Sequence, residues 1–244
     1  MLYLQYIPIF GNTKRRNIMG NTIDFPQSGD VEQATMYHNM RHEPRNSEVL
    51  ESYEELIRCL RYQFTAIHDQ GITVELSNTN PYRTSKEMFA AIDETGVLRV
   101  ARTGMEGEHF PDMHMMLNMA GLSDGRGEPM LVNDMFRAVH DYVGHYLPGN
   151  SFSPDGECCA FFVHQETLPE IAHLALWCET RGQNAWTNFY GGHNLKPRSE
   201  RPFPEQKMGV VMMDTINAQL ETRRDTYLAS HPVDSIVEMF SLPQ

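Results

Sequence analysis

The fold is constrained most strongly by a series of helical patterns that begins after Pro129. Apolar residues recur at helical spacing in four segments, 132–146, 156–167, 169–182 and about 205–229. In the first half, helices are predicted from 47 to about 69 and within "TSKEMFAAIDETG" (84–96). Each precedes a short strand, "ITVELS" (72–77) or "VLRVAR" (97–102). The sequence therefore predicts a mainly α (α+β) fold, in which a helical core carries a small sheet from the N-terminal half.

The chain is predicted to form one domain with an N-terminal arm. Its 244 residues can bury one substantial core, and no internal repeat or linker is visible. Residues 1–46 are rich in Asn, Gly, Pro and charge and show little periodicity. We therefore predict a largely irregular arm over 1–46 and a single globular domain over 47–244.

Charge and cysteine content exclude several classes of protein. The 20 basic and 32 acidic residues give a net charge of −12, which argues against a general nucleic-acid surface or a basic membrane-binding patch. The opening "MLYLQYIPIF" is too short for a membrane span, and Pro8 interrupts it. The four cysteines show no disulfide framework. These features predict a cytoplasmic protein with no membrane partner, and no pattern indicates an oligomeric state.

Two histidines lie in the apolar segment "NDMFRAVHDYVGHYLPG" (133–149). On a regular helix, the five-residue separation of His140 and His145 would put their side chains about 140° apart. Gly144 and Pro148 are predicted to break the last turn, which would let both imidazoles converge on one metal ion. A buried histidine bonded to a backbone carbonyl is the alternative explanation for each.

A carboxylate in the next helical segment suggests a third metal ligand. Glu179 falls on the apolar face of 169–182, where a carboxylate is costly unless it is paired or bound to metal. An ion pair with Arg181 or Arg137 is the alternative. Two imidazoles and one carboxylate leave coordination positions open, as in non-haem Fe(II) oxygenases and several catalytic zinc sites. We therefore predict a metal site formed by His140, His145 and Glu179.

Other polar residues surround this predicted site. Glu157 and His164 share a largely apolar helix face, and they could orient the ligands, bind a second metal or form a structural pair. With Arg181 they are the candidate catalytic residues. A pocket for a small polar or aromatic substrate is predicted around Gln183, Trp186 and Tyr190, although capping and turn roles explain these residues equally well. No residue could be assigned to an organic cofactor.

The segment "PMLVNDMFRAVHDYVGHYLPGNSF", followed by "LWCETRG", resembles the catalytic core of the pterin-dependent aromatic amino-acid hydroxylases. The likeness covers roughly residues 129–183. In that family an H-x4-H motif supplies two iron ligands and a later Glu the third, so the resemblance implies iron ligation by His140, His145 and Glu179. It also implies O2 as co-substrate, a pterin cofactor and an aromatic substrate. The family's usual "HELLGH" reads "HDYVGH" here.

The preferred interpretation is an Fe2+-dependent oxygenase, a monooxygenase or hydroxylase, that acts on a small organic substrate. Zn2+ or Mn2+ are alternative metals. "VHDYVGH" also resembles the HD-type metal-dependent phosphohydrolases, in which the metal would be held by His114 or His109, His140 with Asp141, and Asp214. A third possibility is a zinc-stabilised structural or interaction protein, with Glu157 or His164 as a further ligand.

Overall fold

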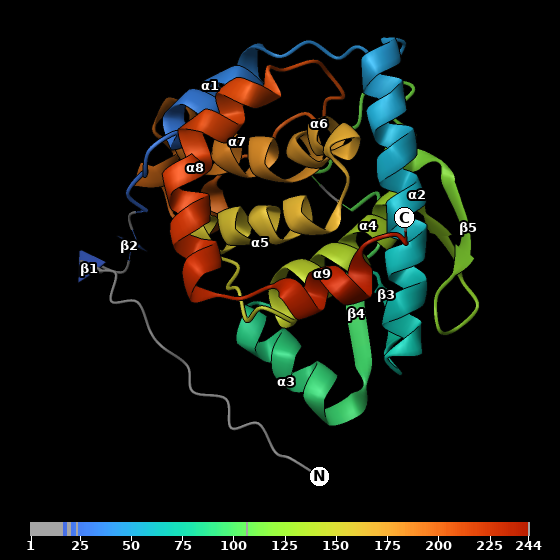
Figure 1. Ribbon diagram of the computed structural model, residues 1–244. Helices are drawn as coiled ribbons and strands as arrows, with labels where there is room; N and C mark the ends of the chain where they lie inside the picture. Colours follow the sequence, from blue (N-terminus) through green and yellow to red (C-terminus); the bar gives the residue numbers. More distant parts are fainter. Residues whose placement is uncertain (1–16, 19–20, 23, 106, 244) are drawn as a thin grey trace.

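The computed structural model describes residues 17–18, 21–22, 24–105 and 107–243 (Figure 1). Helix predominates among the described residues and the strands are few and short, so the predicted mainly α fold with small sheets is confirmed. The strands of the described part form three two-stranded sheets, β1–β2, β3–β4 and β5–β6. The helices include α1 (Asp30–Asn39), α2 (Ser47–Asp69), α3 (Ser85–Thr95), α4 (Val132–Val139), α5 (Pro154–Thr167), α6 (His173–Trp177), α7 (Gln183–Phe189), α8 (Met213–Ser230) and α9 (Asp234–Phe240).

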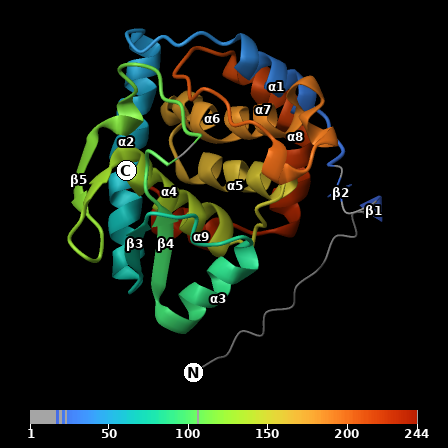
Figure 2. The same cartoon turned by 180° about the vertical axis from the view of Figure 1, so that it is seen from behind.

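The first half follows the predicted order of helices and strands. Helix α2 begins where the Asn46 side chain accepts hydrogen bonds from the amides of Glu48 and Val49. Strands β3 (Thr73–Ser77) and β4 (Val97–Ala101) pair in parallel, because α3 provides the crossover between them. In both views α3, β3 and β4 lie at one end of the molecule, and β5 (Met119–Ser123) lies on the outer side of α2 (Figures 1 and 2).

Helix α1 lies within the arm that was expected to be largely irregular. It packs against α7, and part of its buried face is polar rather than apolar, with Asp30 and Gln33 almost inaccessible to solvent. A helix that is buried partly through polar contacts has a weak apolar period, which explains why the sequence pattern missed it. Residues 1–16 of the arm lie outside the described residues.

Helix α8 begins at Met213, eight residues later than the predicted start near 205. The preceding residues 201–212 form an extended segment that includes Pro202, Pro204 and Gly209. Proline restricts helix formation, and a side chain at Gly209 would lie 2.2 Å from the carbonyl oxygen of Arg41. The segment therefore passes close to the chain that leaves α1.

Most buried apolar side chains form one continuous core that joins α2, β3, β4, α4, α5, α6, α8 and α9. A smaller cluster of Ala34, Ala185 and Phe189 lies between α1 and α7. None of the described helices is both long and apolar enough to cross a membrane. All four cysteines are free thiols, as the lack of a disulfide framework predicted.

Candidate metal centre

The helix predicted over 132–146 does extend to Tyr146, but its last turns are wider than those of an α-helix. After α4, residues His140–Tyr146 form a π-helix, η2. The amides of Leu147 and Asn150 donate to the carbonyls of Tyr142 and His145, each five residues earlier, at 3.0 and 2.9 Å. Residues five apart lie on nearly the same face of such a helix. The predicted break at Gly144 was therefore wrong, whereas the helix does end at Tyr146, just before Pro148, and the predicted convergence of the two imidazoles is confirmed.

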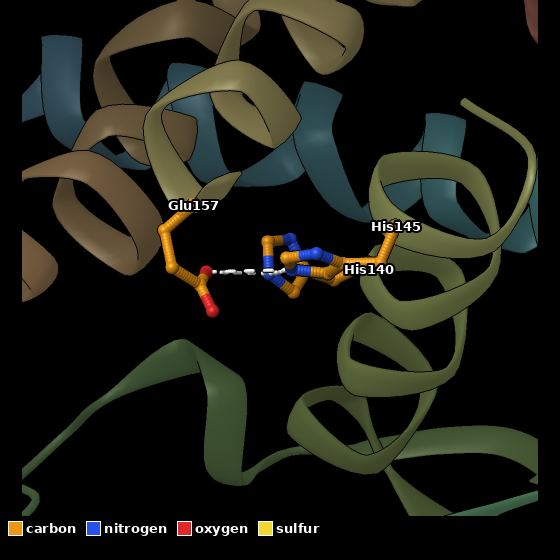
Figure 3. A group of neighbouring side chains, drawn as sticks. All are labelled: His140, His145 and Glu157. Atoms are coloured by element: carbon orange, nitrogen blue, oxygen red, sulfur yellow. Dashed lines mark hydrogen bonds and ion pairs between the residues drawn. The ribbon is translucent and has the colours of Figure 1, made fainter. Parts of the chain in front are cut away.

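Three side chains meet at one point between η2 and α5 (Figure 3). The Nε2 atoms of His140 and His145 are 3.0 Å apart, and the Oε2 atom of Glu157 lies 3.2 Å from the first and 3.4 Å from the second. With metal–ligand bonds of about 2.1 Å, these separations correspond to angles of roughly 90–110° at a shared cation. Among the described residues this is the one group of three potential ligands at such spacing.

Both imidazoles are held by contacts on their Nδ1 side. His145 Nδ1 lies 3.3 Å from the carbonyl oxygen of Asn150, whose own side chain is bonded to the Gly144 carbonyl and to Tyr227. His140 Nδ1 lies 3.3 Å from Nε2 of His164. Partners of this kind fix the ring orientation and tautomer of metal-binding histidines and leave Nε2 available for a cation. His164 therefore orients His140, which is one of the roles that the sequence suggested for it.

Gly144 allows α5 to approach η2 closely. A Cβ atom at this position would lie 2.9 Å from Nε2 of His164 and 3.0 Å from Cβ of Ala160. The glycine is thus required for packing between the two helices rather than for an off-helix backbone conformation.

The charges within the group favour a cation. Burial alone would raise the pKa of Glu157, but His145 and His140 lower it well below its ordinary value. Burial likewise opposes protonation of His145, whereas Glu157 raises its pKa. Burial lowers the pKa of His164 far below the usual range, so this ring is neutral. A metal ion held here would contact the ionised carboxylate of Glu157 and would compete with a proton for His145.

Glu179, the predicted third ligand, lies in a second π-helix, η4 (Cys178–Gly182), and is not part of this group. Its carboxylate accepts hydrogen bonds from the Tyr53 hydroxyl and, at 3.1 Å, from Nε2 of Gln183. Nε2 of His114 is 3.4 Å away. Burial raises the pKa of Glu179 to about 7, and burial lowers that of His114 to about 3. Glu179 is therefore a buried carboxyl group surrounded by neutral donors.

One cavity connects Glu179 with the metal-binding group. Its volume is about 250 Å³, and His140, Glu157 and Glu179 all line it. The rest of the wall is rich in amide side chains, with Asn133, Gln183, Asn184 and Gln206, together with Phe136, Arg137, Thr180, Thr187 and Phe203. Gln183 is thus the one predicted substrate-binding residue that lines this cavity. Glu179 faces the same space as His140 and Glu157 without joining the metal-binding group.

The other predicted site residues lie elsewhere. Arg181 forms a buried ion pair with Asp30 at 2.5 Å instead of pairing with Glu179. Tyr190 stacks on His38 with ring centroids 4.1 Å apart, and Trp186 Nε1 lies 3.4 Å from Nδ1 of the same histidine. Neither aromatic residue lines the cavity beside the metal-binding group.

The residues required by the phosphohydrolase interpretation are not brought together. Asp214 is exposed near the start of α8, and His109 is exposed in the loop before η1 (Met115–Leu117). His114 contacts Glu179. Among the described residues, only His140 of that proposed set belongs to the three-residue group.

Arg137, which was considered as a partner of Glu179, pairs with Glu108 instead. Glu157 was predicted as an orienting residue, a ligand of a second metal, a member of a structural pair or a further ligand of a structural zinc, but not as the third member of the group that His140 and His145 form. The available signal was its position in the first turn of α5, seven residues before the buried His164.

Comparison with protein-family models, with curated protein sequences and with solved structures found no significant match to this chain. The geometry of the site therefore carries the functional argument.

Proposed function

We propose that the chain is an enzyme that depends on one divalent metal ion, held by His140, His145 and Glu157. The supporting observation is that three ligand atoms lie 3.0–3.4 Å from one another, with both imidazoles oriented from behind. His140 and Glu157 also line the cavity, so coordination positions would be open to a substrate. A structural zinc site is usually closed by four protein ligands. His164, a candidate fourth ligand, contacts Nδ1 of His140 on the opposite side of the ring.

The reaction that we propose first is O2-dependent hydroxylation of a small organic molecule by an Fe2+ enzyme. Two histidines and one carboxylate form the ligand set of many non-haem Fe(II) oxygenases, and iron held in this way supplies O2 activation. Phe136 stacks on His140 with ring centroids 5.9 Å apart and lines the same cavity, where it provides apolar surface beside the metal-binding group. The pterin and the aromatic amino acid implied by the resemblance stay predictions.

A hydrolytic reaction with Zn2+ or Mn2+ is the second candidate, and Glu179 is the observation that favours it. Its pKa of about 7 suits a group that takes up and releases a proton near neutral pH. It lines the same cavity as His140 and Glu157, and Tyr53 and Gln183 hold its carboxylate in place. Two histidines and one glutamate also bind zinc in several hydrolases.

The metal content of the purified chain tests the proposal. We expect one metal ion per chain by elemental analysis, and its loss in Glu157→Gln. Glu166→Gln is the matched control, because Glu166 is an exposed carboxylate on the same helix. Metal content near zero in the wild type after incubation with Fe2+, Zn2+ and Mn2+ in turn would reject the proposal.

The reaction class is tested on the loaded protein. O2 consumption that requires Fe2+ supports the oxygenase. Hydrolysis of amide or ester substrates by the Zn2+ form, with a loss of rate in Glu179→Gln, supports the second candidate.

The four free thiols support a reducing compartment, and we propose the cytoplasm.

A further inference from the structure

A second cavity adjoins the one beside the metal-binding group. Its volume is about 550 Å³, and Arg137 and Phe203 line both cavities. Much of the wall is apolar or aromatic, with Pro81, Tyr82, Ala101, Met105 and Phe152. Because the two cavities share a boundary, a small molecule held in the second one would lie beside the metal centre.

Asp141 brings an unpaired carboxylate into the wall of this second cavity. It belongs to the first turn of η2, directly after the proposed ligand His140, and is half-buried. Within the described part of the chain, its carboxylate makes no hydrogen bond and no ion pair, yet its oxygen atoms remain accessible to solvent. A carboxylate that has lost part of its hydration favours a ligand that supplies positive charge and hydrogen-bond donors.

The two arginines of the same wall do not pair with Asp141. Arg137, one turn earlier in the chain, is engaged by Glu108. The side chain of Arg83 is 92% exposed, and it lies 3.9 Å from Glu87. Arg137 therefore balances the charge of Glu108, whereas Asp141 has no counterion of this kind among the described residues.

An aromatic ring lies near this carboxylate. Burial raises the pKa of Tyr82, and the negative charge of Asp141 raises it further, because the hydroxyl and the carboxylate are close to each other. The Tyr82 hydroxyl accepts a hydrogen bond from the amide of Arg99 at 3.1 Å, which fixes the ring. The faces of aromatic rings attract cations, so a carboxylate beside aromatic and apolar surface suits an organic cation.

We propose that the second cavity binds a protonated primary or secondary amine that carries a small apolar group. The ammonium N–H groups donate to Asp141, and the ring of Tyr82 contacts the cation. The apolar group lies against Phe152 and Phe203, toward the boundary with the metal cavity. The inference rests on the proposed function in one respect, namely that the adjacent metal acts on the bound amine.

Binding of three probes of similar shape to the full, metal-free chain tests the inference. The probes are benzylamine, benzyl alcohol and benzoate, which are cationic, neutral and anionic. The metal is left out because an amine can itself bind to a metal ion. In ligand-observed NMR titrations, we expect benzylamine to bind at least about tenfold more tightly than benzyl alcohol, and benzoate to bind more weakly than both.

Variants of the carboxylate test its role. Asp141→Asn removes the charge and keeps the size of the side chain, so benzylamine should bind at least about tenfold more weakly while benzyl alcohol binding stays unchanged. Asp141→Glu keeps the charge and should retain most of the affinity. Asp69→Asn is the matched control, because Asp69 is an exposed carboxylate at the end of α2, outside both cavity walls. It should bind benzylamine like the wild type.

A second pair of variants tests the ring of Tyr82. Tyr82→Leu removes the ring and should weaken benzylamine binding about threefold. Tyr82→Phe keeps the ring and loses only the hydroxyl that the amide of Arg99 contacts, so it should bind benzylamine like the wild type. Urea unfolding of every variant checks that the folded state is retained.

Equal binding of benzylamine and benzyl alcohol by the wild type, or unchanged benzylamine binding in Asp141→Asn, would overturn the inference. Loss of benzylamine binding in Glu157→Gln, together with its retention in Asp141→Asn, would also overturn it, because the amine would then lie in the metal cavity. Failure of the proposed function would be seen separately, as absence of metal in elemental analysis. Amine binding by a chain that holds no metal ion would reject the metalloenzyme and leave an amine-binding protein.

Discussion

His140 and His145 point their Nε2 atoms to within 3.0 Å of each other although five residues separate them in the chain. On a regular α-helix these side chains would diverge by about 140°. The π-helix of His140–Tyr146 removes this divergence, and Glu157 approaches the pair from the neighbouring helix α5. The ligand geometry therefore depends on a local widening of one helix and on the close approach of another.

Gly144→Ala should weaken both packing and metal binding. The added methyl group would meet His164 and Ala160, and overpacking of this kind costs about 1–3 kcal/mol of unfolding free energy. Because His164 orients His140, metal affinity should also fall, by roughly 10–100-fold. Denaturant titration and metal competition measure the two effects. An unchanged metal affinity would contradict the role assigned to this contact.

Glu179→Gln should keep the metal and change the pH dependence of stability. Burial raises the pKa of this carboxyl group from 4.5 to about 7 in the folded chain. Between these values the folded state binds the proton more tightly than the unfolded state, so this group lowers stability as the pH rises from about 4.5 to 7. The variant has no carboxyl group at this position, so its stability does not fall in this way. The unfolding free energy of the variant, measured relative to that of the wild type, should therefore increase by on the order of 2 kcal/mol from pH 5 to pH 8.

The measurement for Glu179 is urea denaturation of the metal-free protein at a series of pH values. Comparing the variant with wild type cancels the contributions of titrating groups that do not contact Glu179. His114, which lies 3.4 Å from this carboxylate, stays neutral in the folded chain over this pH range, because burial lowers its pKa to about 3. A difference that is independent of pH would show that the folded carboxyl group titrates normally. Loss of metal from Glu179→Gln would instead return this residue to the ligand set.

Tyr53→Phe should act through Glu179. The Tyr53 hydroxyl donates to the carboxylate and lowers the pKa of Glu179, so its removal should raise that pKa further. We expect a destabilisation of about 1–3 kcal/mol at pH 8, where the carboxylate is ionised, and a smaller one at pH 5. Denaturation at the two pH values measures it. Equal losses at both would indicate a packing effect of the hydroxyl group alone.

Arg181→Met should destabilise the fold without being needed for metal binding. The guanidinium lies fully buried against Asp30, and removal of one partner from a buried pair costs about 3 kcal/mol. Arg58→Met is the matched control, because Arg58 pairs with Glu55 on the exposed face of α2 and should change stability little. Thermal or urea unfolding measures both variants. Loss of metal from a folded Arg181→Met chain would instead support the catalytic position predicted from sequence.

Local patterns predicted much of the fold because they report local physics. Helix α2, the unit formed by β3, α3 and β4, and the burial of His145 follow from periodicity and capping signals, whereas His140 is half-buried. The start of α8 was misplaced because helix-forming residues continue upstream of Met213 through a segment that proline and close packing keep extended.

The ligand set was harder to predict, because it depends on distant contacts. The apolar stripe on residues 169–182 correctly indicated that Glu179 is buried. It did not indicate which residues contact the carboxylate. Its main donor, Tyr53, lies 126 residues earlier in the chain. Glu157 lies beside the imidazoles because Gly144 lets α5 approach η2, and no spacing within a single helix reveals that approach.

The ion pair between Asp30 and Arg181 bears on where the chain can be shortened. Arg181 belongs to the same turn as Glu179, so α1 supports one wall of the cavity although it lies more than a hundred residues upstream. A crystallisation variant that begins at residue 47 would lack α1 and its ion pair with Arg181, whereas one that begins before Gly29 would retain both.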